Sequence, residues 1–134
     1  MKAAVIFSAK QGKRRWWNLF TGRKFAHCWA VFENNGVVVS INPLIWGVQV
    51  SILNMTLAEY LRDVRTNPLF TAAFKMELEY LPTDRAVYRG LYSCVSITKA
   101  VLGINDWRIL TPKQLHDFFE RIKNGRCSRN GYGQ

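Results

Sequence analysis

Two runs of β-branched and aromatic residues are separated by a tetrapeptide that favours a tight turn. The runs are "FAHCWAVF" (25–32) and "VVVSINP" (37–43), and the residues between them are "ENNG". Asn and Gly tolerate positive φ angles, and Asn-Gly between apolar runs is a strong signal of a β-hairpin. The sequence therefore predicts two antiparallel strands, joined either by all four residues or by Asn35-Gly36 alone.

One face of this hairpin is predicted to carry an imidazole beside polar side chains. Alternation along the first strand puts His27 on the same face as Trp29, and Cys28 on the opposite, core-facing side. If all of "ENNG" forms the loop, His27 lies opposite Asn42; with a two-residue turn, Asn42 is diagonal to it. In both registers Asn42 and Ser40 share the face of His27, because opposed residues of an antiparallel pair point the same way.

Other apolar runs predict three more strands, at residues 3–9, 47–53 and 70–81. Residues 82–89 are expected to form a loop. With about three helices, these strands indicate a single α+β domain over residues 1–125, built on a small antiparallel sheet. The basic end of the chain, residues 126–134, is expected to be frayed.

The helix starts are marked by N-cap residues. Thr56 is followed three residues later by Glu59, which is the spacing of a capping box. A second helix is expected to begin at Cys94 and to stop before Gly103, since glycine is the usual residue after a helix end. A third is expected from Thr111, which precedes a proline at the first helical position, to residue 125.

Positive charge is concentrated near the N-terminus. The 134 residues carry a net charge of +10, and residues 1–32 contain seven Lys or Arg and no acidic residue. Within them lies the run "KQGKRRWW", whose candidate anion-binding residues are Lys13, Arg14, Arg15, Trp16 and Trp17. Two interpretations are open: a surface for an anionic partner, which could be nucleic acid, another anionic polymer, an acidic protein or a membrane face, or charge that only keeps the protein in solution.

The three cysteines, Cys28, Cys94 and Cys127, have neither an even number nor a CxxC spacing. A disulfide framework and a four-ligand zinc site are therefore not expected, and no metal or cofactor is implied. Reduced thiols fit a cytosolic setting. The first residues lack the order of regions of a signal peptide, and no apolar run is long enough to span a membrane.

Cys94 is the candidate nucleophile. Ser93 is the expected N-cap, and the positive end of a helix dipole favours a thiolate at the first helical position. His27 would accept and return a proton, and Asn42, with Ser40 as the second choice, would orient the imidazole ring. The alternative is structural: a packed thiol and a satisfied histidine in an apolar strand. The other histidine, His116, is expected at the surface.

The segments "FAHCWAVF…VVVSINP" and "YSCVSITKAVLGI…ILTPKQL" together resemble the circularly permuted branch of the papain-like, NlpC-related thiol enzymes, in which the histidine strand precedes the cysteine helix. The pairing of "HCWAVF" with "CVSITKAVLGI" and "TPKQL" is similar to small proteins encoded by bacteriophages. The resemblance covers residues 20–118. It implies a permuted papain-like fold with Cys94 as nucleophile, His27 as base and a polar residue of the following strand, Asn42 or else Ser40, as orienting residue. Tyr92 and Ser93 are the residues expected to line the oxyanion site.

The resemblance also implies acyl chemistry at an amide, ester or thioester bond, with a peptidoglycan peptide as one candidate substrate. The expected setting is the cytoplasm of an infected bacterial cell, or the virion. The alternative is a non-enzymatic phage protein of the same fold that binds nucleic acid or a host protein through its basic, aromatic N-terminal segment. The oligomeric state is left open.

Overall fold

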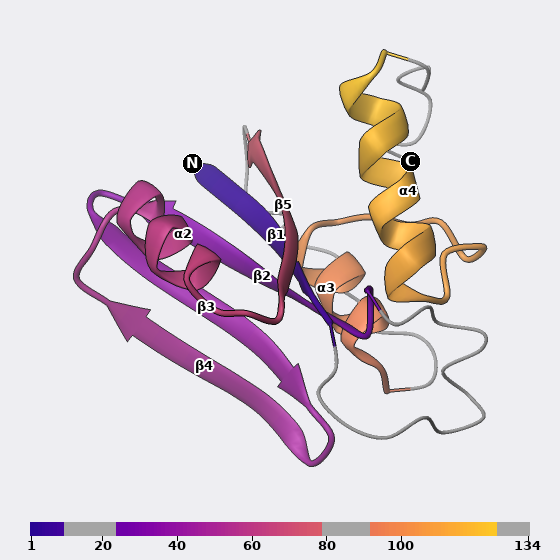
Figure 1. Ribbon diagram of the computed structural model, residues 1–134, viewed down its shortest axis with the longest axis horizontal. Helices are drawn as coiled ribbons and strands as arrows, with labels where there is room; N and C mark the ends of the chain where they lie inside the picture. Colours follow the sequence, from indigo (N-terminus) through magenta and orange to yellow (C-terminus); the bar gives the residue numbers. More distant parts are fainter. Residues whose placement is uncertain (10–23, 79–91, 126–134) are drawn as a thin grey trace.

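The computed structural model describes residues 1–9, 24–78 and 92–125, and these residues form an α+β structure (Figure 1). Five strands make one antiparallel sheet in the order β4-β3-β2-β1-β5. The strands are β1 (Lys2–Ser8), β2 (His27–Asn34), β3 (Val37–Leu44), β4 (Gly47–Leu53) and β5 (Phe70–Glu77). The helices among the described residues are α2 (Leu57–Arg65), α3 (Cys94–Val101) and α4 (Pro112–Lys123). The predicted α+β class, an antiparallel sheet packed with helices, is confirmed.

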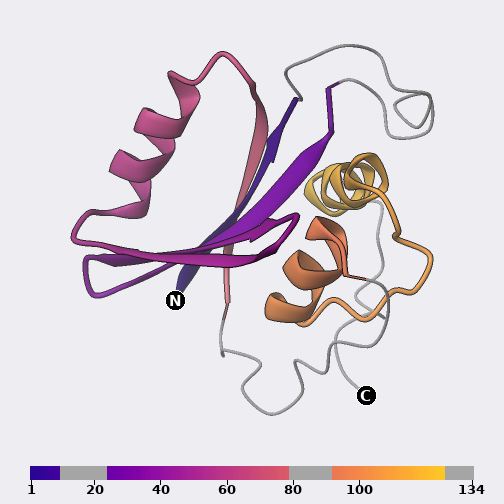
Figure 2. The same ribbon diagram turned by 90° about the horizontal axis from the view of Figure 1, so that it is seen from below.

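Helices cover both faces of the sheet (Figure 2). Helix α2 packs on one face, where Leu57 and Leu61 meet Ile6 of the interior strand β1. Helices α3 and α4 lie on the other face, where Val95 and Leu115 belong to the same buried cluster as alternate residues of β1 and β2. Residues 3–7 of β1 are fully buried. A continuous apolar strand is stable there because both of its faces are covered.

The hairpin of β2 and β3 turns through two residues. Asn34 pairs with Val37, and the intervening Asn35 and Gly36 have φ angles of 51° and 78°. Two successive positive φ angles belong to the turn whose twist matches that of the flanking strands. Of the two predicted registers, the two-residue turn is therefore the one present, and it places Asn42 diagonally to His27.

Local capping interactions fix the helix starts where the sequence predicts them. The Thr56 Oγ1 atom accepts a hydrogen bond from the Glu59 backbone N–H at 3.2 Å, and Glu59 Oε2 accepts one from the Thr56 N–H at 2.8 Å. Thr111 and Gln114 form the same reciprocal pair at the start of α4. Ser93 caps α3 by accepting from Ser96 N–H at 3.1 Å.

Several predicted boundaries shift or lie outside the described residues. Strand β2 begins at His27 and not at residue 25, and β5 ends at Glu77. The predicted continuation of that strand to residue 81, the loop at 82–89 and the tail at 126–134 lie outside the described residues. So does the basic segment that contains Lys13, Arg14, Arg15, Trp16 and Trp17, together with Cys127.

The prediction that His116 lies at the surface is wrong. Its side chain is 17% exposed, and its ring packs against Phe25, with centroids 4.2 Å apart, and against Phe7 at 5.6 Å. The reason is its position on α4: residue 116 is one turn before Phe119 and falls on the apolar stripe that faces the sheet.

Within the described residues, no helix is both long and apolar enough to cross a membrane.

Candidate active site

Cys94 lies at the start of α3, which packs on β2 and β3. Its side chain is half-buried, while the next residue, Val95, is buried in the core. The backbone N–H groups of the first helical turn have no acceptor within the helix, and the N-terminal end of the helix dipole is positive. The fold thus holds a partly accessible thiol at a position that favours negative charge.

His27 and Asn42 are joined by a short hydrogen bond between the first strand of the hairpin and the second. The distance from His27 Nε2 to Asn42 Oδ1 is 2.7 Å. An amide oxygen only accepts, so Nε2 carries a hydrogen, and Nδ1 is the ring nitrogen left to exchange a proton with another group. The ring also stacks on Trp29, with centroids 5.8 Å apart and planes inclined by 24°. The imidazole is therefore fixed in both tautomer and orientation.

Cys94 and His27 interact across the site, although 66 residues separate them in the sequence, and each shifts the pKa of the other. Burial lowers the pKa of His27, but the hydrogen bonds with Cys94 and Asn42 outweigh burial, and the net pKa is raised above 6.5. The shift favours a protonated imidazole beside a negatively charged sulfur. Cys94, His27 and Asn42 are thus connected in series.

The pKa of the Cys94 thiol is lowered from 9.0 to about 4. The largest cause is a hydrogen bond from the Cys28 side chain; burial opposes it, and the hydrogen bond with His27 adds to it. The backbone of Cys28 lowers the pKa of Cys94 as well. At neutral pH the sulfur is therefore a thiolate held by donors from the first two residues of β2.

Cys28 is the site residue that sequence reasoning treated only as core. It is fully buried, as expected, and belongs to the cluster against which Cys94 packs. Its Sγ is also 3.7 Å from the Oγ1 of Thr98, one turn after Cys94 on α3. Hydrogen bonding with Cys94 and burial raise the pKa of Cys28 well above its usual value, so Cys28 stays a neutral donor. The sequence feature that could have identified Cys28 as a site residue is its position directly after His27.

The remaining predicted site residues have other partners. Ser40, the second choice for the orienting residue, is buried, and its hydroxyl hydrogen-bonds with that of Tyr60 at 3.2 Å. The Tyr92 hydroxyl donates to the carbonyl of Gly47 in the turn between β3 and β4. The structure thus pairs Asn42, and not Ser40, with His27. Ser93 serves α3 as its N-cap.

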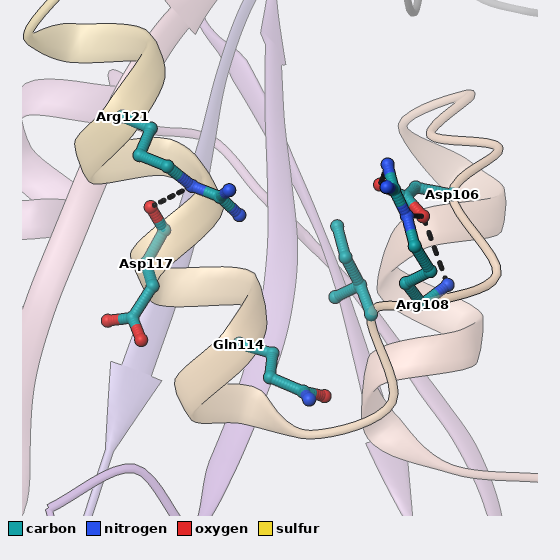
Figure 3. A pocket seen from close by; sticks show the side chains of 6 residues that line it. Asp106, Arg108, Gln114, Asp117 and Arg121 are labelled. Atoms are coloured by element: carbon teal, nitrogen blue, oxygen red, sulfur yellow. Dashed lines mark hydrogen bonds and ion pairs between the residues drawn. The ribbon is translucent and has the colours of Figure 1, made fainter. Parts of the chain in front are cut away.

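A pocket elsewhere on the molecule contains none of these residues. It lies between α4 and the segment before it, and its charged side chains pair with near neighbours (Figure 3). Arg108 Nε donates to Asp106 Oδ1 at 3.0 Å, and Arg121 Nε donates to the carbonyl of Asp117 at 3.3 Å.

Among the residues that the structure describes, no three His, Cys, Asp or Glu side chains converge as a metal site would require.

Comparison of the chain with protein-family models, with curated proteins and with solved structures found no match.

Proposed function

We propose that the protein is a cysteine-dependent hydrolase or acyltransferase that acts on an amide, ester or thioester bond. Cys94 is the nucleophile, His27 is the general acid and base, and Asn42 orients the His27 ring. The observation that supports this most strongly is the connected series of contacts, in which a thiolate meets an imidazole whose other nitrogen is bound to an amide oxygen. Such a series is the arrangement that nucleophilic thiol catalysis requires.

In the first half of the reaction the Cys94 sulfur attacks the carbonyl carbon of the substrate, and a carbon–sulfur bond forms. The carbonyl oxygen becomes negative, and the N–H groups in the first turn of α3 are suited to stabilise it. His27 then gives its Nδ1 proton to the leaving group as the bond to the carbonyl carbon breaks. The products of this half are a thioester on Cys94 and a neutral His27.

In the second half, neutral His27 takes a proton from the acceptor as that acceptor attacks the thioester. Water as acceptor gives hydrolysis, and an amine, alcohol or thiol gives transfer. Cleavage of the carbon–sulfur bond restores the thiolate and the protonated imidazole. Asn42 keeps the ring in one orientation throughout, because its oxygen retains the hydrogen on Nε2 and leaves Nδ1 free to exchange a proton.

These roles agree with those that the resemblance to the permuted papain-like, NlpC-related enzymes implies. The same resemblance makes a peptidoglycan peptide a candidate substrate and a phage protein a candidate identity. A non-enzymatic role through residues 13–17 stays a prediction, since those residues lie outside the described part of the structure.

The test is turnover of a chromogenic ester, an acyl thioester and a peptidoglycan stem peptide by the native protein and three variants. Cys94→Ser should abolish turnover. His27→Gln should lower turnover by about 10²- to 10⁴-fold, the range that general acid–base catalysis contributes. Asn42→Ala should lower it by about 10-fold or more, because the ring loses its fixed tautomer.

Cys127→Ser is the matched control, because it removes a thiol that has no role in the proposed mechanism. It should leave turnover unchanged. Far-ultraviolet circular dichroism of each variant establishes that it is folded. Turnover that survives Cys94→Ser in a folded protein would refute the proposal, and so would the absence of turnover from all three substrate classes in the native protein.

A further inference from the structure

The neighbourhood of Cys94 holds a second thiol that the proposed reaction does not consume. Cys94 packs against the buried cluster that contains Cys28, and the Cys28 side chain is the largest influence that lowers the pKa of the Cys94 thiol. The Cys28 Sγ is 3.7 Å from the Oγ1 of Thr98, which lies four residues after Cys94 on α3 and shares its helix face. Both cysteines are unbridged in the structure.

The two thiols differ sharply in accessibility. Cys94 is half-buried, whereas Cys28 is fully buried. A small polar oxidant therefore meets the Cys94 sulfur first. Oxidation of cysteine depends on thiolate character and on exposure, and Cys94 has both. Cys28, which stays protonated, has neither, but it lies where it can react with an oxidised Cys94.

We propose that Cys94 and Cys28 form a peroxide-reactive thiol pair, in which Cys94 is oxidised by a hydroperoxide and Cys28 resolves the product into a reversible disulfide. The inference does not depend on acyl turnover, since it needs only the Cys94 thiolate and the adjacent Cys28 thiol.

The two steps balance with hydrogen peroxide as the oxidant. The Cys94 thiolate attacks one peroxide oxygen, the O–O bond breaks, and the departing hydroxide takes the proton of His27 to become water. Cys94 is then a sulfenic acid. In the second step the Cys28 sulfur attacks the Cys94 sulfur, the S–O bond breaks, and the hydroxyl group leaves as water with the Cys28 proton. The net change is two thiols oxidised and one peroxide reduced to two waters.

The fold favours the disulfide over further oxidation of Cys94. Both side chains belong to one packed cluster, so a short movement within it can bring the sulfurs to a bond length of about 2.05 Å. Both cysteines sit at the beginning of their elements, Cys94 as the first residue of α3 and Cys28 as the second of β2. Formation of the bond would remove the nucleophile and so switch off any chemistry at Cys94 until a thiol reductant restores it.

The test treats the Cys127→Ser protein with stoichiometric hydrogen peroxide, blocks the remaining thiols with iodoacetamide, and maps the products by mass spectrometry without reduction. The expected result is a peptide pair joined through Cys28 and Cys94, lost on treatment with dithiothreitol, which restores both thiols to alkylation. Accumulation of Cys94 sulfinic acid without that peptide pair would overturn the proposal.

Cys28→Ala is the matched variant. With at least three equivalents of hydrogen peroxide and no resolving thiol, Cys94 should progress to sulfinic and sulfonic acids, and dithiothreitol should no longer restore its alkylation. If Cys94 in folded Cys28→Ala still recovers fully, the proposal is wrong. The same disulfide mapping on the peroxide-treated native protein needs no variant. A disulfide that joins Cys94 to Cys127, and not to Cys28, would also refute the proposal.

Discussion

Acidification should slow the alkylation of Cys94 far less than that of an ordinary thiol. The pKa of Cys94 is about 4, against 9.0 for an unperturbed cysteine. At about pH 5 an ordinary thiol is only about 0.01% thiolate, whereas Cys94 is about 90% thiolate, which is an advantage of about 10⁴-fold. At about pH 7 the same advantage is only about 100-fold.

The intrinsic reactivity of the sulfur acts in the opposite direction. A thiolate of lower pKa is a weaker nucleophile, and the slope known for thiol–disulfide exchange predicts a loss of about 100- to 300-fold over this difference in pKa. The two effects nearly cancel at about pH 7. At about pH 5 the net advantage of Cys94 is about 30- to 100-fold. A rate comparison at neutral pH alone would therefore miss the activation of this thiol.

The assay follows iodoacetamide labelling of Cys94 by mass spectrometry between about pH 5 and about pH 8, in the folded protein and in the same protein unfolded by urea. The folded rate should be nearly constant, and the unfolded rate should fall about tenfold for each pH unit. If the folded rate falls as steeply as the unfolded one, Cys94 is not a stabilised thiolate and the electrostatic reasoning is refuted.

Three further predictions concern the donor thiol and the packing. Cys28→Ala removes the largest cause of the low Cys94 pKa, so the alkylation profile should move to higher pH by about one unit or more. Leu115→Ala creates a cavity at a fully buried position and should lower the free energy of unfolding by about 2–5 kcal/mol in urea titrations, while Leu110→Ala, at a position 69% exposed, should change it by less than about 0.5 kcal/mol. Thr111→Ala removes the cap of α4 and should cost about 0.5–2 kcal/mol by the same measurement. An equal effect of both leucine substitutions, or no effect of Thr111→Ala, would contradict the packing described.

The features that the sequence predicted well are those decided by neighbouring residues. The Asn-Gly dipeptide determines the hairpin turn through its backbone preferences, and the Thr56 and Thr111 capping boxes determine helix starts through contacts only three residues apart. The alternation of strand residues also placed Asn42 on the face of His27. Interactions between residues this close in the chain can be recognised from a short stretch of sequence.

The features that the sequence did not predict depend on packing between distant segments. Alternation places Cys28 on the side of β2 opposite His27, yet Cys94 interacts with both, because α3 packs on β2. No spacing within β2 contains that information. The wrong prediction for His116 has a different cause. Positions 112, 115, 116 and 119 follow the apolar period of a helix, but histidine is a polar residue and does not by itself indicate a buried position.

The most direct test of the central claim, that Cys94 is an acyl-accepting nucleophile, is the trapping of its thioester. The folded protein is mixed with an activated acyl ester, quenched in acid, and analysed by intact and peptide mass spectrometry. We predict one acyl group per chain, carried on Cys94, released by hydroxylamine, absent from Cys94→Ser, and strongly reduced in His27→Gln. Acylation that is spread over lysines or Cys127, or that is unchanged in His27→Gln, would contradict the account.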